Sequence, residues 1–172
     1  MKYGRWNIEG YDREYAVKLL KSGINPLVAV LLSSRKIGED KIARLTGEEP
    51  CEIFDPFRLK DMDRAVERIR KALIAGERIA VYGDYDVDGI TSSCLMTQYL
   101  RKLGAMVILH IPERLEDGYG LRKHTLKAMK DAGVSLVITV DCGMTAIEEI
   151  EYAGSIGLDM VITDHHECAE TL

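Results

Sequence analysis

The stretch IAVYGDYDVDG, residues 79–89, decides the fold that we expect for this chain. It opens with a short apolar run that contains β-branched residues, which indicates a buried strand. Three aspartates, Asp84, Asp86 and Asp88, follow that run at alternate positions. A buried strand that leads through a polar turn into a helical segment is the unit from which parallel α/β sheets are built.

The same pattern continues toward the C-terminus, where short β-branched runs alternate with helical segments. We expect strands at Ile79–Tyr82, Met106–His110, Leu136–Val140 and Met160–Thr163. The expected helices between them are Ser92–Leu103, Lys123–Ala132 and Thr145–Ile156. This alternation predicts an α/β fold with a doubly wound, mainly parallel sheet. The order 2-1-3-4 is expected, because the second strand has no acidic cluster after it and suits the outer side.

A helical region precedes these units. Residues 12–45 carry apolar residues at helical spacing, and Asn25-Pro26 has the composition of a helix start. A further apolar stripe within residues 62–73 is expected to begin at the cap Asp61 and to pack on the sheet. We therefore predict a helical N-terminal lead-in over residues 1–55 and an α/β core over residues 56–172.

The composition excludes several classes of protein. A chain of 172 residues with 47% hydrophobic residues is long enough to bury one core. Its formal net charge of -5 argues against nucleic-acid binding through bulk positive charge, so any such contact must be local. The four cysteines form no C-x-x-C pair, which indicates reduced thiols. No apolar run is long enough for a signal peptide or a membrane span, so we expect a cytoplasmic protein that does not enter the membrane.

Acidic and imidazole side chains follow three of the four expected strands. The clusters are Asp84, Asp86 and Asp88 after the first strand, Asp141 after the third, and Asp164, His165 and His166 after the fourth. Because the carboxyl ends of parallel strands share one edge of the sheet, these clusters are expected to converge. If the first cluster stays extended, its carboxylates lie roughly 6 to 7 Å apart and each pair repels by about 3 kcal/mol. A cation would relieve that repulsion.

The mixture of carboxylate and imidazole side chains indicates which cation the site would bind. Hard oxygen ligands suit Mn²⁺ or Mg²⁺, and a shared carboxylate such as Asp141 is able to bridge two ions about 3.5 to 4 Å apart. Such a pair of ions activates water and holds a phosphoryl oxygen. The adjacent residues His165 and His166 divide into one metal ligand and one residue free for substrate.

The same residues have simpler interpretations, which stay open at this point. Asp141 alone is also compatible with a helix N-cap, and the Asp84 cluster with a solvated turn. His110 and His124 are more typical of ordinary surface or core histidines than of ligands. A calcium loop of the EF-hand type fails, because Leu95 stands where a bidentate glutamate is required. A phosphatase with an aspartate nucleophile leaves the histidine pair without a role.

The motifs resemble those of the DHH phosphoesterase superfamily, and within it the RecJ-type single-strand-specific exonucleases. The segments that carry the resemblance are YGDYDVDGITS (82–92), VDCG (140–143) and TDHH (163–166), with IPER (111–114) and GYGL (118–121). With the earlier segments DPF (55–57) and DMDRA (61–65), the resemblance extends over nearly the whole chain. The resemblance implies a 5′ to 3′ exonuclease on single-stranded DNA that uses Mn²⁺ or Mg²⁺ in recombination and repair, with a single-strand-binding protein and a repair helicase as partners.

The resemblance also implies roles for individual residues. Asp86, Asp88, Asp141 and His165 correspond to metal ligands, and Asp84 lies in or near the metal shell. His166 corresponds to the contact with the scissile phosphate, so that it and Asp141 are the expected catalytic residues, while Asp164 orients its neighbours. A basic concentration is expected either to contact phosphates or to form a solvated helix face; it consists of Arg114, Arg122, Lys123 and Lys127.

One departure from the family concerns the end of the chain. Leu172 comes soon after His166, whereas members of the family continue with a further aspartate ligand and a second domain. We therefore expect an N-terminal fragment with an incomplete core, weak or inactive by itself. Two alternatives remain, a phosphoesterase of the same superfamily that acts on small molecules or short oligonucleotides, and a non-catalytic scaffold.

Overall fold

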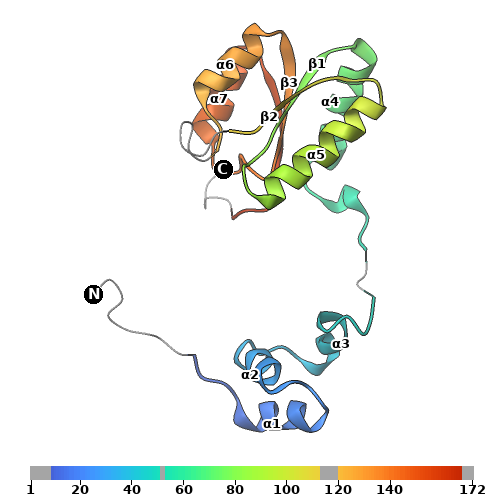
Figure 1. The fold of residues 1–172 in the computed structure, drawn as a ribbon, viewed down its shortest axis with the longest axis vertical. Coiled ribbons are helices and arrows are strands. Elements are labelled where there is room, and N and C mark those ends of the chain that lie inside the picture. The colour runs from blue at the N-terminus through green and yellow to red at the C-terminus, as the bar shows by residue number, and fades with distance from the viewer. Residues whose placement is uncertain (1–8, 51–52, 113–119, 168–172) are drawn as a thin grey trace, which may run out of the picture. The chain divides into compact units, whose positions relative to one another are not determined.

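The computed structural model describes residues 9–50, 53–112 and 120–167. Contacts within the chain divide it into two compact units, Met1–Asp55 and Pro56–Leu172 (Figure 1). No helix within the described ranges is long and apolar enough to cross a membrane.

The first unit is a small helical body. It contains α1 (Arg13–Lys21), α2 (Pro26–Ser34), the 3₁₀ helix η1 (Glu39–Lys41) and α3 (Ile42–Leu45). The helix start predicted at Asn25 is confirmed, because its side chain accepts a hydrogen bond from the Leu27 N–H and Pro26 follows as the first helical residue. The buried core of this unit comprises Leu19, Ala29, Leu32 and Ile42.

The second unit is built on a four-stranded parallel sheet. Its strands are β1 (Arg78–Tyr82), β2 (Met106–His110), β3 (Val134–Val140) and β4 (Asp159–Thr163). Their order is β2-β1-β3-β4, and each neighbouring pair is parallel. The predicted fold class and strand order are therefore confirmed. Because β1, β3 and β4 are adjacent and parallel, the segments that leave their carboxyl ends lie side by side.

Helices cover both faces of this sheet (Figure 1). The 3₁₀ helix η2 (Pro56–Arg58) leads to α4 (Met62–Ala75), which packs with α5 (Val87–Lys102) on one face. On the other face lie α6 (Lys123–Asp131) and α7 (Ile147–Ser155). Alternate residues of β1 serve the two cores, since Ile79 and Val81 face α4 and α5 whereas Ala80 and Tyr82 face α6 and α7.

The start of α5 and the capping of α4 differ from the predictions. Helix α5 begins at Val87 and not at Ser92, because the Asp86 side chain accepts a hydrogen bond from the Gly89 N–H and caps the helix there. The acidic cluster is therefore bent into the helix start, and the extended spacing assumed for its three carboxylates is wrong. Asp61 precedes α4 as predicted, but it has a left-handed backbone and makes no side-chain cap.

Arg68 on α4 ties that helix to the amino ends of two strands. Its Nη2 lies 2.7 Å from Oε2 of Glu77, just before β1, and its Nε lies 2.6 Å from Oδ2 of Asp159, the first residue of β4. Burial disfavours the charged guanidinium, yet the hydrogen bonds to the two carboxylates outweigh it and raise the pKa of Arg68. This double ion pair lies at the end of the sheet opposite to the strand exits.

We expect Arg68→Ala to lower the free energy of unfolding by about 1–3 kcal/mol, because it removes two charge-assisted hydrogen bonds and leaves Glu77 without its guanidinium partner. Urea unfolding followed by circular dichroism would measure the change. Arg70→Ala, on the exposed side of the same helix, is the matched control and should change stability by no more than about 0.5 kcal/mol. Equal losses in the two variants would contradict a role for the ion pairs.

Candidate metal centre

The turn from β1 into α5 supplies the first group of carboxylates. Asp84 is 3% exposed, and its Oδ1 accepts a hydrogen bond of 2.7 Å from the Tyr85 N–H. A Cβ placed on Gly89 would lie 2.4 Å from the Asp84 carbonyl oxygen. Only glycine allows the start of α5 to approach the backbone of Asp84 so closely, and this approach positions Asp84 beside the helix cap Asp86.

Asp141 stands immediately after β3, and its backbone is left-handed with φ of 61°. Its N–H donates to the Thr163 carbonyl oxygen at 2.9 Å, so the residue is still attached to β4. It does not cap a helix, because α7 begins at Ile147 with Ala146 at the cap position. The alternative that Asp141 is only an N-cap is therefore wrong.

The carboxylate of Asp141 is buried with an unusual lack of hydrogen bonds. Oδ1 lies 2.8 Å from Nε2 of His165, but neither carboxylate oxygen accepts a well-directed hydrogen bond from the described residues. Burial raises the pKa of Asp141, the nearby charge of Asp86 raises it further, and His165 opposes both effects. Two buried oxygens of this kind are normally satisfied by partners, and a cation would satisfy both.

The carboxylate of Asp164, at the exit of β4, differs from that of Asp141 because both of its oxygens accept hydrogen bonds. Its Oδ2 accepts a hydrogen bond from the Met144 N–H at 2.9 Å, and its Oδ1 accepts one from the His166 N–H at 3.1 Å. The same Oδ1 lies 2.7 Å from Nδ1 of His166. Burial disfavours the charged carboxylate, but these hydrogen bonds together lower the pKa of Asp164. Asp164 thus holds its neighbours, and its oxygens already have partners.

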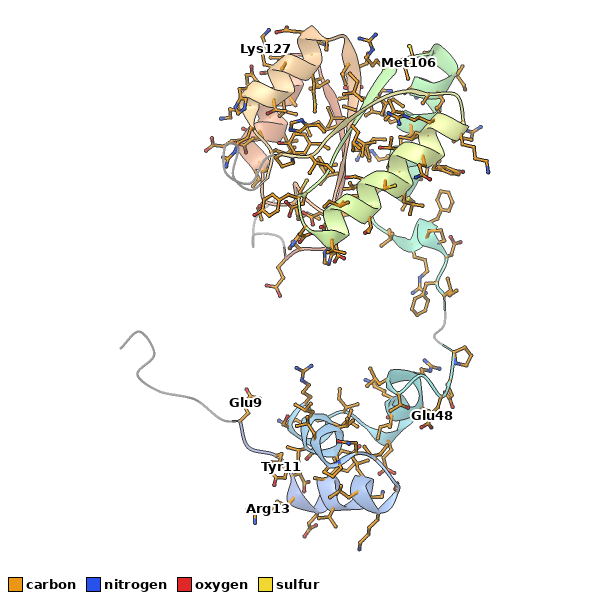
Figure 2. The ribbon with its side chains drawn as sticks, in the orientation of Figure 1. Glu9, Tyr11, Arg13, Glu48, Met106 and Lys127 are labelled. Carbon is orange, nitrogen blue, oxygen red and sulfur yellow. The ribbon has the colours of Figure 1, made fainter. Side chains whose placement is uncertain are left out.

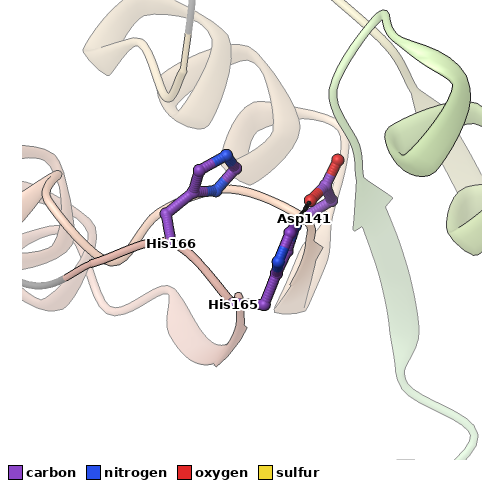
Figure 3. A group of neighbouring side chains, drawn as sticks. All are labelled: Asp141, His165 and His166. Atoms are coloured by element: carbon purple, nitrogen blue, oxygen red, sulfur yellow. Dashed lines mark ion pairs between the residues drawn. The ribbon is translucent and has the colours of Figure 1, made fainter. Parts of the chain in front are cut away.

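Two groups of potential ligand atoms meet at Asp141. One group contains Asp84, Asp86 and Asp141, the other Asp141, His165 and His166, and within each group one atom per residue lies within 4.8 Å of the others. Figure 3 shows the second group, with the ion pair between Asp141 and His165 and the ring of His166 beside them. A carboxylate common to two ligand groups has the position required to bridge two cations.

Asp88 belongs to neither group. It lies in the first turn of α5 and lines a cavity of about 540 Å³ together with Asp141, Asp164 and His165. The capped start of α5 separates it from Asp84 and Asp86, so the prediction that it is a metal ligand is neither supported nor excluded by these groups. It stays a prediction.

The predicted basic concentration is not an unpaired positive surface. Arg114 lies outside the described residues, and Arg122 is partly buried at the start of α6. Lys123 Nζ lies 3.0 Å from Oε2 of Glu148, and Lys127 Nζ lies 2.5 Å from Oδ1 of Asp131. Figure 2 labels Lys127 on α6. These carboxylates compensate both lysines, so a phosphate would have to compete with them. The role of this segment in substrate binding stays a prediction.

The sequence did not indicate several contacts beneath the centre. The Met144 N–H donates to Asp164, and Thr139 and Thr163 bond to each other across β3 and β4. The only sequence signal for the latter contact is a threonine near each aspartate, Thr139 two residues before Asp141 and Thr163 directly before Asp164. Cys142 is buried with its Sγ 3.7 Å from the Tyr82 carbonyl oxygen, and burial raises its pKa to about 12, so it is an inert core thiol.

Comparison with known proteins agrees with this geometry. Residues 78–172 match the DHH family, N-terminal domain. The single-stranded-DNA-specific exonuclease RecJ of Bacillus subtilis is 42% identical over 95% of this chain, and that of Escherichia coli is 39% identical over 67% of it. A crystal structure of exonuclease RecJ bound to manganese superposes with a TM-score of 0.64 at 36% identity, covering 71% of this chain and 31% of that one.

A second crystal structure, RecJ from Thermus thermophilus in complex with Mn²⁺, covers 95% of this chain and 23% of its own with a TM-score of 0.62 and 25% identity. The chain belongs to the DHH family. It is similar to RecJ over most of its length. It spans 21% of the length of the Bacillus subtilis relative and 20% of the Escherichia coli one.

Gly89→Ala should disrupt the candidate centre, because the added Cβ would meet the Asp84 backbone at 2.4 Å and force the turn or the helix to move. We expect a loss of about 1–3 kcal/mol in the free energy of unfolding, despite the better helix propensity of alanine. Gly154→Ala on α7 is the matched control, since a Cβ there meets nothing within 4 Å. It should gain up to about 1 kcal/mol in urea unfolding. A gain in both variants would contradict the close approach.

The stability of the metal-free protein should depend on pH through Asp164 and His166. The hydrogen bond to Asp164 raises the pKa of His166 above its ordinary value of 6.5. The contribution of His166 is therefore fully present below that value and is lost as the pH rises through the folded pKa. The pKa of Asp164 is lowered, so its contribution is lost only as the pH falls through its folded pKa.

Urea unfolding in the presence of a chelator would test this dependence. His166→Ala should lower the free energy of unfolding more at about pH 5.5 than at about pH 9. The same loss at both pH values would show that the protonated imidazole does not stabilise the fold.

Proposed function

We propose that this chain carries the metal-binding part of a phosphodiesterase that hydrolyses single-stranded DNA from the 5′ end and depends on Mn²⁺ or Mg²⁺. The observation that carries the proposal is the buried Asp141 carboxylate, which lies in two ligand groups and whose oxygens have no well-directed hydrogen bond from the described residues beside the ion pair with His165. The relatives named as single-stranded-DNA-specific exonucleases, one of them crystallised with manganese, support the same substrate and cation.

The donor set fits two hard divalent cations. Carboxylate oxygens with a few imidazole nitrogens suit Mn²⁺ or Mg²⁺, whereas a thiolate-preferring metal would require cysteine. Asp84, Asp86 and Asp141 would hold one ion, and Asp141 with His165 would hold the other. Asp88 is assigned to the ligands on family resemblance. When bound, the ions supply an activated water molecule and hold oxygens of the phosphoryl group.

His166 has a different role in this proposal. Its Nδ1 lies 2.7 Å from Oδ1 of Asp164, which orients the ring, and we assign its Nε2 to a phosphate oxygen. A raised pKa favours the protonated imidazole, which would donate a hydrogen bond from Nε2 to the negative phosphate. Asp164 fixes the orientation of this ring and therefore acts on the substrate only through His166. Asp141 and His166 are the residues that we place at the reacting phosphate.

The substrate contacts and the setting rest on family resemblance. Phosphate binding by Arg114, Arg122, Lys123 and Lys127 remains our assignment for the basic segment. A net charge of -5 means that such local contacts would have to hold the strand. We place the activity in DNA recombination and repair in the cytoplasm, with a single-strand-binding protein and a repair helicase as partners.

Separate measurements of Mn²⁺ affinity and cleavage would test the two histidine roles. His165→Ala should weaken Mn²⁺ binding at least about tenfold, because it removes a ligand. His166→Ala should leave the Mn²⁺ affinity within about threefold, but in a longer chain that includes the further aspartate ligand and second domain of the family it should lower cleavage of 5′-labelled single-stranded DNA by about 10²-fold or more. Calorimetry would give the affinity, and single-turnover digestion with protein in excess would give the cleavage rate.

Asp141→Asn should remove both Mn²⁺ binding and cleavage, which excludes a contaminating nuclease. His124→Ala, on α6 and outside both ligand groups, is the matched histidine control and should change neither. No Mn²⁺ binding by the wild type at millimolar metal would overturn the proposed centre. Equal loss of Mn²⁺ in His165→Ala and His166→Ala would overturn the division of roles.

A further inference from the structure

Two threonines connect the last residues of β3 and β4. The Thr163 hydroxyl donates to the Thr139 carbonyl oxygen at 2.6 Å, and the Thr163 N–H donates to the Thr139 Oγ1 at 3.3 Å. Thr139 is fully buried. Valine at these positions would keep the β-branched shape but would lose both side-chain hydrogen bonds. The hydroxyls therefore add inter-strand hydrogen bonds that backbone pairing alone does not provide.

The loop that carries Asp141 is attached to the exit of β4 at two points. The Asp141 N–H donates to the Thr163 carbonyl oxygen at 2.9 Å, and the Met144 N–H donates to Oδ2 of Asp164 at 2.9 Å. Between these points Asp141 has a φ of 61°, which is uncommon for a residue other than glycine. The position of β4 relative to β3 therefore sets the conformation of Asp141.

The Thr139 hydroxyl also lies directly under this loop. A Cβ placed on Gly143, whose φ is 111°, would lie 3.2 Å from Thr139 Oγ1 and 3.3 Å from Cγ2 of Ile162. The loop thus rests on the two strands with little free space. A shift of Thr139 or Thr163 would be transmitted to Asp141 and Asp164, which follow them within two residues.

We propose that Thr139 and Thr163 are positioning residues of the metal centre. Their reciprocal hydrogen bonds fix the exit of β3 against the exit of β4, so that Asp141 reaches both ligand groups while Asp164 stays engaged with Met144 and His166. Functional groups must be held within about 0.5 Å of their working geometry, and a carboxylate shared by two ions has the least tolerance. The inference rests on the proposed function, because it assumes that Asp141 binds the cations.

Thr139→Val and Thr139→Ser separate the hydroxyl from the shape of the side chain. Thr139→Val should weaken Mn²⁺ binding by about 10- to 100-fold, the range found when groups that orient metal ligands are removed. Thr139→Ser keeps the acceptor oxygen and should stay within about threefold of wild type. Mn²⁺ affinity is measured by calorimetry on the 172-residue chain, at a temperature where circular dichroism shows each variant to be fully folded.

Two control variants distinguish positioning from a general loss of stability. Val134→Ala truncates a buried side chain at the opposite end of β3, and should lower the melting temperature without changing Mn²⁺ affinity. Thr97→Val on α5 removes a buried hydroxyl that has no hydrogen-bond partner among the described residues, and should leave Mn²⁺ affinity unchanged.

The outcomes separate this inference from the proposed function. If wild type binds no Mn²⁺, the proposed centre is wrong and the inference fails with it. If wild type binds Mn²⁺ and Thr139→Val binds equally well, the inference alone is wrong. It is also wrong if Thr139→Ser or Val134→Ala loses as much affinity as Thr139→Val. Loss in Thr139→Val with retention in Thr139→Ser and both controls supports positioning by the hydroxyl.

Discussion

The burial of the Asp141 carboxylate is the constraint on which the rest of the centre depends. A carboxylate that is 8% exposed and whose oxygens accept no hydrogen bond from the described part of the chain is costly unless another charge compensates it. In this molecule the imidazole of His165 approaches one oxygen, and the negative charge of Asp86 adds to the cost. The surroundings of Asp141 therefore favour a divalent cation, and the fold places further donors on both sides of it.

The parallel sheet explains how these donors come together. Strands β1, β3 and β4 run side by side in one direction, so their carboxyl ends deliver Asp84, Asp141 and Asp164 to one edge. Glycine permits a close local approach, where the start of α5 lies against the Asp84 backbone. The stabilising ion pairs of Arg68 and the candidate metal ligands lie at opposite ends of the sheet. Arg68 contacts the amino ends of β1 and β4, whereas the carboxyl ends of the strands carry the candidate ligands.

The neighbouring residues Asp164 and His166 show that similar side chains at one edge serve different purposes. The Asp164 oxygens accept hydrogen bonds from Met144 and His166, so this carboxylate orients groups, whereas Asp141 has only the ion pair of one oxygen with His165 and no well-directed hydrogen bond from the described residues. Hydrogen bonding to the charged form lowers the pKa of Asp164, and burial beside another carboxylate raises that of Asp141. In the sequence, Asp141 and Asp164 are alike, since each is an aspartate that follows a strand. Their pKa values shift in opposite directions because their hydrogen-bond partners in the structure differ.

The sequence by itself determined the α/β class, the strand order and the convergence of the acidic and histidine clusters. These follow from local patterns, since apolar runs define strands and the exits of parallel strands share an edge. Only the tertiary structure decided that Asp86 caps α5, that Asp88 stands apart from both ligand groups, and that Lys123 is paired with Glu148. It also decided the burial of Asp141 and the bonds between Thr139 and Thr163. At the turn after β1, a capped helix start competes with extended backbone, and the local sequence is compatible with both. Ion pairs, burial and cross-strand hydrogen bonds join residues that are distant in sequence, and no local pattern encodes the distance between such residues in space.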